Sequence, residues 1–346
     1  MYRRAVAYKY WMIILILSKG EFVFASPIDK DSAAFYYQKA MILQKENKAN
    51  DAMSALEQAI FFDSSNLELR LSYVDVLLQQ KRYNSARNEL QKILEISNNH
   101  LAALEKITTI NFLFNRWTEV IHYGVKVLEQ KEESNIQYML GKAYYETEDY
   151  GNAKLMLEKA VRKEPNKKDR VVLLGKVYIE LSEYYNALNA YKLAIDIEPD
   201  KDILYEFGLI NYTVNNERDA VKYYELAAEK GYKKDLDYLE NLGMAYLSFD
   251  MSKGLGILNK VLEKKPKNRE IMTEIAHAYF KKKSFDVAAE TFYQLYLNDN
   301  RNNEALYMSG LALIKGGDKL KGNEICEKAL HTDPSLSHLK RLSFLN

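Results

Sequence analysis

Small and apolar residues recur with a helical period along most of the chain. In residues 140–165 they fall on one face of each of two predicted helices: Leu140, Gly141 and Tyr144 on the first, and Ala153, Leu157 and Ala160 on the second. The polar stretch 148–151 between them predicts a turn. Pro165 predicts the end of the second helix, because proline cannot continue its hydrogen bonding. The pattern therefore predicts a hairpin of two helices.

The same pattern returns at once in residues 174–199. Gly141 and Gly175 hold equivalent places, so the period is 175 − 141 = 34 residues. A frame with small residues at the eighth, twentieth and twenty-seventh positions extends from residue 33 to residue 336. The predicted repeats begin at Ala33, Leu67, Leu101, Ser134, Lys168, Lys201, Leu236, Arg269 and Asn303. This predicts about nine helix pairs, followed by a tail or cap over residues 337–346.

Two irregularities interrupt the frame. The distance from Gly208 to Gly243 is 35 residues instead of 34, and Gly243 to Gly254 is 11 where Gly141 to Ala153 is 12. An inserted residue and a deleted residue so close together predict a local change in superhelical pitch around residues 231–254. A hinge or an altered groove is expected there.

The first 25 residues follow a different pattern. Arg3, Arg4 and Lys9 precede the apolar run 11–17, and Val23 and Ala25 supply small residues before a cut at Ala25/Ser26. This order predicts a signal peptide over residues 1–25 and an exported protein, periplasmic or otherwise in the cell envelope. An uncleaved anchor is the alternative, but the apolar run is far shorter than the ~20 residues that span a bilayer. No stable membrane span is expected after cleavage.

Charge and cysteine content narrow the classes of function. Lys and Arg number 49 against 48 for Asp and Glu, so no overall field favours nucleic acid, and no nucleic-acid partner is predicted. The single cysteine, Cys326, excludes an intramolecular disulfide and a cysteine-based metal cluster. It stands where other repeats have Leu157, Tyr191 or Phe292, which predicts a buried packing residue.

The sequence shows no spacing of residues that is typical of a catalytic or metal-binding site. The five histidines lie in different repeats without a ligand pair at HxxxH or HExxH spacing. Glu119 and His122 are one helical turn apart, for which a solvated helix face is the simpler interpretation. The glycines form no phosphate-binding loop. No enzyme, cofactor or metal site is predicted.

The repeat resembles the tetratricopeptide repeat, whose unit of about 34 residues has this order of small and aromatic residues and a closing proline. The resemblance covers nearly all of the chain after residue 32. It implies an all-α, right-handed α-α superhelical solenoid of about nine helix pairs. It also implies a concave face that is lined by first helices and binds partner proteins.

In repeats of this family the second, fifth, sixth and ninth positions point into that groove. The fourth and fifth repeats place Lys142 and Lys176 there, whereas the later repeats place acids: Asp202, Glu206, Asp237, Glu240, Glu270, Glu274 and Glu304. Tyr205, Asn241, His277 and Tyr307 lie among the acids. A groove of this kind favours a basic segment of a partner protein. The clamp that grips a peptide's terminal carboxylate in some members is disfavoured, because Tyr37 and Met41 replace its Lys and Asn and no three successive repeats supply the set.

The function predicted from these features is a non-enzymatic scaffold or adaptor of the bacterial cell envelope that binds other proteins. The alternative is an accessory module for surface polysaccharide synthesis or export, in which the aromatic groove meets a sugar. Exposed apolar residues on the end faces leave stacking into a homo-oligomer open.

Overall fold

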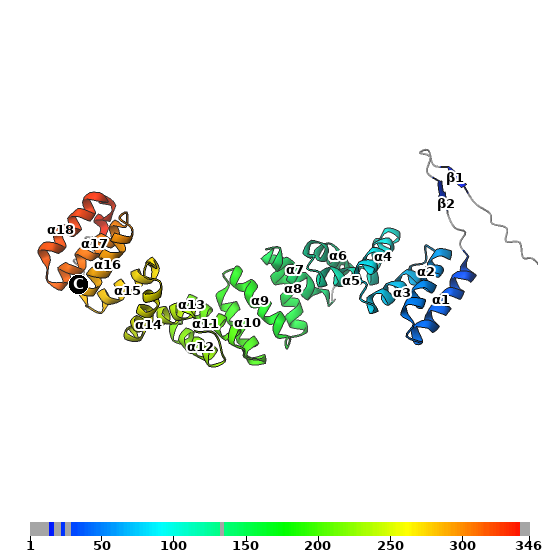
Figure 1. Cartoon of the computed structure of the whole chain (residues 1–346), viewed down its shortest axis with the longest axis horizontal. Helices are drawn as coiled ribbons and strands as arrows, with labels where there is room; N and C mark the ends of the chain where they lie inside the picture. Colours follow the sequence, from blue (N-terminus) through cyan, green and yellow to red (C-terminus); the bar gives the residue numbers. More distant parts are fainter. Residues whose placement is uncertain (1–13, 17–21, 25–28, 132–134, 340–346) are drawn as a thin grey trace, which may run out of the picture. The chain divides into compact units, whose positions relative to one another are not determined.

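The computed structural model describes residues 14–16, 22–24, 29–131 and 135–339. The chain divides into two units, Met1–Pro165 and Asn166–Asn346. Each unit is a series of antiparallel helix pairs in which consecutive helices pack together (Figure 1).

Unit 1 contains two short strands and eight helices within its described residues. The strands β1 (Ile14–Ile16) and β2 (Phe22–Phe24) pair antiparallel, with Leu15 opposite Val23. The helices are α1 (Lys30–Lys45), α2 (Ala49–Phe62), α3 (Leu67–Gln79), α4 (Tyr83–Ile96), α5 (Leu101–Leu113), α6 (Trp117–Gln130), α7 (Ile136–Glu146) and α8 (Tyr150–Lys163).

Unit 2 contains ten α-helices and a short 3-10 helix in the part of the chain that is described. They are α9 (Lys168–Glu180), α10 (Tyr184–Ile197), α11 (Lys201–Thr213), α12 (Glu217–Glu229), α13 (Leu236–Leu247), α14 (Met251–Lys264), α15 (Arg269–Lys281), α16 (Phe285–Asn298), α17 (Asn303–Gly316), α18 (Lys319–Thr332) and η1 (Pro334–His338).

Polar caps and prolines set the ends of these helices. Before α13 the Asp235 carboxylate accepts the Tyr238 N–H at 3.1 Å, and before α15 the Asn268 side chain accepts the Ile271 N–H at 3.2 Å. Such caps satisfy backbone donors that a helix leaves unpaired at its start. α8 ends at Lys163, before Pro165, as predicted. Local sequence thus positions the helix boundaries.

Small residues let the two helices of a pair approach closely. A Cβ at Gly175 on α9 would lie 2.7 Å from the ring of Tyr191 on α10, and Tyr191 is fully buried. A side chain at position 175 would therefore displace this ring. Cys326 lies at the place equivalent to Tyr191 and is 7% exposed, which confirms its predicted role in packing.

The turn inside every described pair but one depends on one residue in the left-handed conformation. Seven of the described turns use a residue other than glycine with φ between 54° and 62°, namely Asn47, Lys81, Asn115, Glu148, Ser182, Asn215 and Lys283, and Gly317 serves the last turn. The turn between α13 and α14, residues 248–250, contains no such residue. This is the place of the deletion that the glycine spacing indicates.

The inserted residue lies in the connection between α12 and α13. This connection comprises residues 230–235, whereas α14 and α15 are joined by residues 265–268. Gly231 adopts a φ of +91°, and the N–H of Tyr232 donates to the Ala227 carbonyl at 2.9 Å, which closes the end of α12. The predicted change in pitch around residues 231–254 stays a prediction.

The two ends of the chain differ in how far they are described. After α18, η1 brings Leu336 and Leu339 into a cluster with Leu306, Tyr307 and Leu311, so the start of the tail covers the last apolar face. Most of the predicted signal peptide, residues 1–25, lies outside the described residues. Among the helices that are described, none is long and apolar enough to cross a membrane.

Candidate functional site

Six of the predicted groove acids lie on the three first helices α11, α13 and α15 of unit 2. We call this set the acidic face: Asp202, Glu206, Asp237, Glu240, Glu270 and Glu274. Asp202, Asp237 and Glu270 are exposed, and the other three are half-buried.

Two lysines neutralise part of the acidic face. Lys176 on α9 lies 3.6 Å from Glu206, so this predicted groove residue pairs with another. Lys265, which follows α14, lies 2.9 Å from Asp237 and 3.5 Å from Glu240. Among the described residues, Asp202, Glu270 and Glu274 form no ion pair. The uncompensated charge is therefore concentrated at these three carboxylates.

Tyrosines beside the acidic face respond to this charge. Burial raises the pKa of Tyr212 on α11, and the Glu274, Glu217 and Glu270 carboxylates raise it further. Burial also raises the pKa of Tyr232, with further contributions that include Asp202 and Glu206. Both phenols therefore stay neutral at physiological pH, and the nearby carboxylates add to the cost of ionising them.

Two aromatic residues expected in the groove belong to the core instead. Tyr205 is 8% exposed because the ring of Tyr232 stacks on it, with centroids 4.1 Å apart and planes at 18°. Tyr307 is 3% exposed and packs in the cluster below the tail. Neither ring presents a surface to a partner, which corrects the prediction for these two positions.

Asn241, a predicted groove residue, supports this core with a hydrogen bond. Its side-chain amide donates to the Tyr205 hydroxyl at 2.7 Å, and the amide is half-buried. The inserted connection that carries Tyr232 thus builds a tyrosine cluster of Tyr205, Tyr224, Tyr232 and Tyr238 under the acidic face.

His277 and Glu304 lie beyond the acidic face, where basic residues join them. Both line a cavity of about 380 Å³ that Arg269 and Arg301 also line. The His277 ring lies edge-on to Phe292, with centroids 5.0 Å apart. The negative surface therefore does not continue unbroken to the last repeat.

In unit 1 the predicted groove residue Lys142 lies over two aromatic rings. Its ammonium nitrogen is 5.8 Å from the ring centre of Phe112 and 5.7 Å from that of Trp117. These rings occupy the twelfth and seventeenth positions of the third repeat. The fourth and eighth repeats carry Tyr145 with Tyr150 and Phe280 with Phe285 at the same positions. The recurrence of aromatic residues at these two positions is visible in the sequence and could have identified the pairs. The pairs lie outside the four positions that were expected to face the groove.

Family models decide the classification of this repeat. Models described as the tetratricopeptide repeat match residues 43–107, 134–167 and 171–201. The chain is a tetratricopeptide-repeat protein. Proteins with tetratricopeptide repeats mediate protein–protein interaction, and the fold is typically a non-catalytic scaffold.

The chain is similar to solved structures of tetratricopeptide-repeat proteins. The C-terminal part of such a protein from Cytophaga hutchinsonii is 21% identical, with 69% of this chain and 98% of that chain covered and a TM-score of 0.51. YrrB, described as having an unusual peptide-binding site, is 18% identical, with 54% and 97% covered and a TM-score of 0.44. A protein from Parabacteroides merdae is 15% identical, with 62% and 84% covered and a TM-score of 0.37. No curated protein matches the chain.

The predicted all-α solenoid of helix pairs is thus confirmed for this tetratricopeptide-repeat protein. Within the described ranges, no three His, Cys, Asp or Glu side chains are placed to hold one metal ion. The chemistry that the acidic face offers is electrostatic, since fixed carboxylates attract cations without reacting with them.

Proposed function

We propose that the protein is a non-enzymatic scaffold or adaptor that binds a basic segment of a partner polypeptide on the acidic face. The observation that carries this proposal is the group of carboxylates without an ion pair among the described residues, on the first helices α11 and α15, namely Asp202, Glu270 and Glu274. Glu270 and Glu274 are four residues apart on α15. Like charges at this spacing destabilise a helix by about 0.2–0.5 kcal/mol, and a bound Lys or Arg would relieve this repulsion.

Reversing these two charges tests the proposal. The bait is the chain from residue 26 to residue 346, and the prey is a bacterial envelope extract. We expect Glu270→Lys with Glu274→Lys to weaken capture of the partner at least about tenfold and to reduce the salt dependence of binding. Isothermal titration with the purified partner or with its basic segment measures the affinity.

The matched control reverses two exposed acids on second helices, Glu229→Lys on α12 with Glu263→Lys on α14. It should bind as the parent does. Equal affinity of the parent, the charge-reversed variant and the control for the partner would show that the acidic face does not bind it. Retardation on polysaccharide affinity gels without capture of a polypeptide would favour the alternative in surface polysaccharide synthesis or export.

We also propose that the scaffold works in the cell envelope. The N-terminal order of basic residues, apolar run and small residues supports this setting. Fractionation of the native host should place the protein outside the cytoplasm, with Ser26 as the first residue of the mature chain. A cytoplasmic protein that retains residues 1–25 would contradict this placement.

A further inference from the structure

A second surface of unit 2 has an apolar floor. It is a cavity of about 760 Å³ among α15, α16, α17 and the residue after η1. Its floor is formed by Phe280, Phe285, Met308, Leu311 and Leu339. The two phenylalanine rings meet edge to face with centroids 5.5 Å apart, and both are partly exposed. A volume of about 300–1,000 Å³ is typical of pockets that bind ligands.

The cavity is rimmed by basic residue types. Lys281, Lys283, Lys315 and His277 complete its lining, which contains no carboxylate. Lys281 and Lys283 are exposed and form no ion pair within the described part of the chain. An apolar floor with a lysine rim therefore lies a short distance along the chain from the acidic face.

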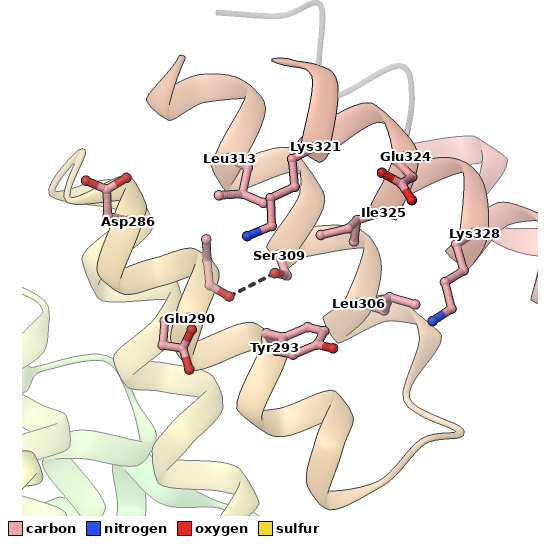
Figure 2. A pocket seen from close by; sticks show the side chains of 11 residues that line it. Asp286, Glu290, Tyr293, Leu306, Ser309, Leu313, Lys321, Glu324, Ile325 and Lys328 are labelled. Atoms are coloured by element: carbon pink, nitrogen blue, oxygen red, sulfur yellow. Dashed lines mark hydrogen bonds between the residues drawn. The ribbon is translucent and has the colours of Figure 1, made fainter. Parts of the chain in front are cut away.

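A neighbouring cavity shows that this arrangement is not general in unit 2. The cavity in Figure 2, of about 390 Å³, lies among α16, α17 and α18. Its lining mixes Asp286, Glu290 and Glu324 with Lys321 and Lys328, and the Ser309 hydroxyl donates to the Ala289 carbonyl at 2.8 Å. Because this lining carries charges of both signs, it favours neither an anionic nor a cationic ligand.

We infer that the cavity of Phe280 and Phe285 binds an acidic polypeptide segment that inserts an aromatic or leucine side chain. The inserted side chain is removed from water by the apolar floor, and the flanking carboxylates meet Lys281 and Lys283. This site shares no residue with the acidic face and takes a partner of opposite charge, so one unit would hold a basic and an acidic segment together.

Fluorescence anisotropy with a short labelled peptide tests the inference on the chain from residue 26 to residue 346. The probe has a phenylalanine and a leucine flanked by glutamates, and its two reference peptides replace either the glutamates by lysines or the apolar pair by alanines. We expect Lys281→Gln with Lys283→Glu to weaken binding of the probe at least about tenfold. Glu148 adopts a φ of 62° in the equivalent turn, so glutamate is tolerated at position 283.

The control Lys260→Gln with Lys264→Glu makes the same change of charge on exposed positions of α14 and should leave binding of the probe intact. Glu270→Lys with Glu274→Lys should also retain it, which separates this inference from the proposed function. Unchanged binding in the Lys281 and Lys283 variant, or equal binding of the alanine peptide, would overturn the inference. So would binding of the parent to phosphatidylglycerol vesicles without binding of the probe.

Discussion

At the scale of single residues, the close approach of two helix backbones excludes a side chain at some glycines, whereas other glycines have room for one. A Cβ at Gly310 on α17 would lie 2.7 Å from the carbonyl oxygen of Gly322 on α18 and 2.9 Å from the amide nitrogen of Cys326. Backbone atoms cannot move aside as a flexible side chain can. By contrast, a Cβ at Gly256 on α14 meets no atom within 4 Å.

We therefore expect Gly310→Ala to lower the free energy of unfolding by about 1–3 kcal/mol, the usual effect of overpacking. Gly256→Ala should raise it by about 0.4–1 kcal/mol, because alanine reduces the entropy of the unfolded chain and favours helix. Urea unfolding followed by circular dichroism compares the two midpoints. Equal midpoints for the two variants would contradict this account of helix approach.

The surroundings of the individual site residues were only partly predictable from the sequence. The helical period predicted Asp202, Glu270 and Glu274 on one face of their helices, where Asp202 and Glu270 are exposed and Glu274 is half-buried. It could not indicate that Tyr205 is covered, because the ring of Tyr232 comes from a connection with one inserted residue. Lys281 and Lys283 were visible in the sequence, but only the fold brings them to Leu311 and Leu339.

At the scale of helices, the start of α11 combines a cap with an ion pair. The Asp200 carboxylate accepts the N–H groups of Asp202 and Ile203 at 3.1 and 3.0 Å, and it lies 3.0 Å from Lys168. Burial opposes ionisation of Asp200, but these backbone donors and Lys168 outweigh it and hold the pKa below its ordinary value of 3.8. A lowered pKa stabilises the fold above the unfolded value, and this stabilisation is lost as the pH falls through the folded value.

We expect Asp200→Asn to destabilise unit 2 by about 0.5–1 kcal/mol at neutral pH, because asparagine keeps the cap and loses the ion pair. The difference from the parent should vanish as the pH falls through the lowered pKa of Asp200 in the folded state. Urea midpoints measured from neutral to acidic pH test this. The control Asp196→Asn removes an exposed carboxylate on α10 that pairs only with Lys192 in the same helix. A difference that persists at low pH would contradict the role of Asp200.

The pairing of helices was predictable because prolines, caps and the 34-residue frame are local signals. Their spacing also located the insertion and the deletion. The conformation at those places was not predictable, since Ser248 continues with helical angles where other turns place a left-handed residue. Turn geometry depends on how α14 packs on α13, which the period alone does not describe.

At the scale of the whole molecule, the repeated positions bury apolar surface, and the positions that differ between repeats are available for recognition of partners. One helix pair covers only part of its apolar surface, so neighbouring pairs cover one another. Alanines and leucines at the shared positions are buried throughout the described helices. The acidic face and the lysines that rim the cavity occupy positions where the repeats differ, and they give unit 2 two surfaces of opposite charge.

Site-specific photocrosslinking in the native envelope tests whether the acidic face binds a polypeptide. A photoreactive phenylalanine derivative is placed at Asp202 or Thr273, beside the acidic face, and at Lys260 on the second helix α14. We expect crosslinks to a polypeptide from the first two positions and none from Lys260. The crosslinks should disappear when Glu270→Lys and Glu274→Lys are added. Crosslinks to a polypeptide from Lys260 alone, or their persistence in the charge-reversed protein, would contradict binding on the acidic face.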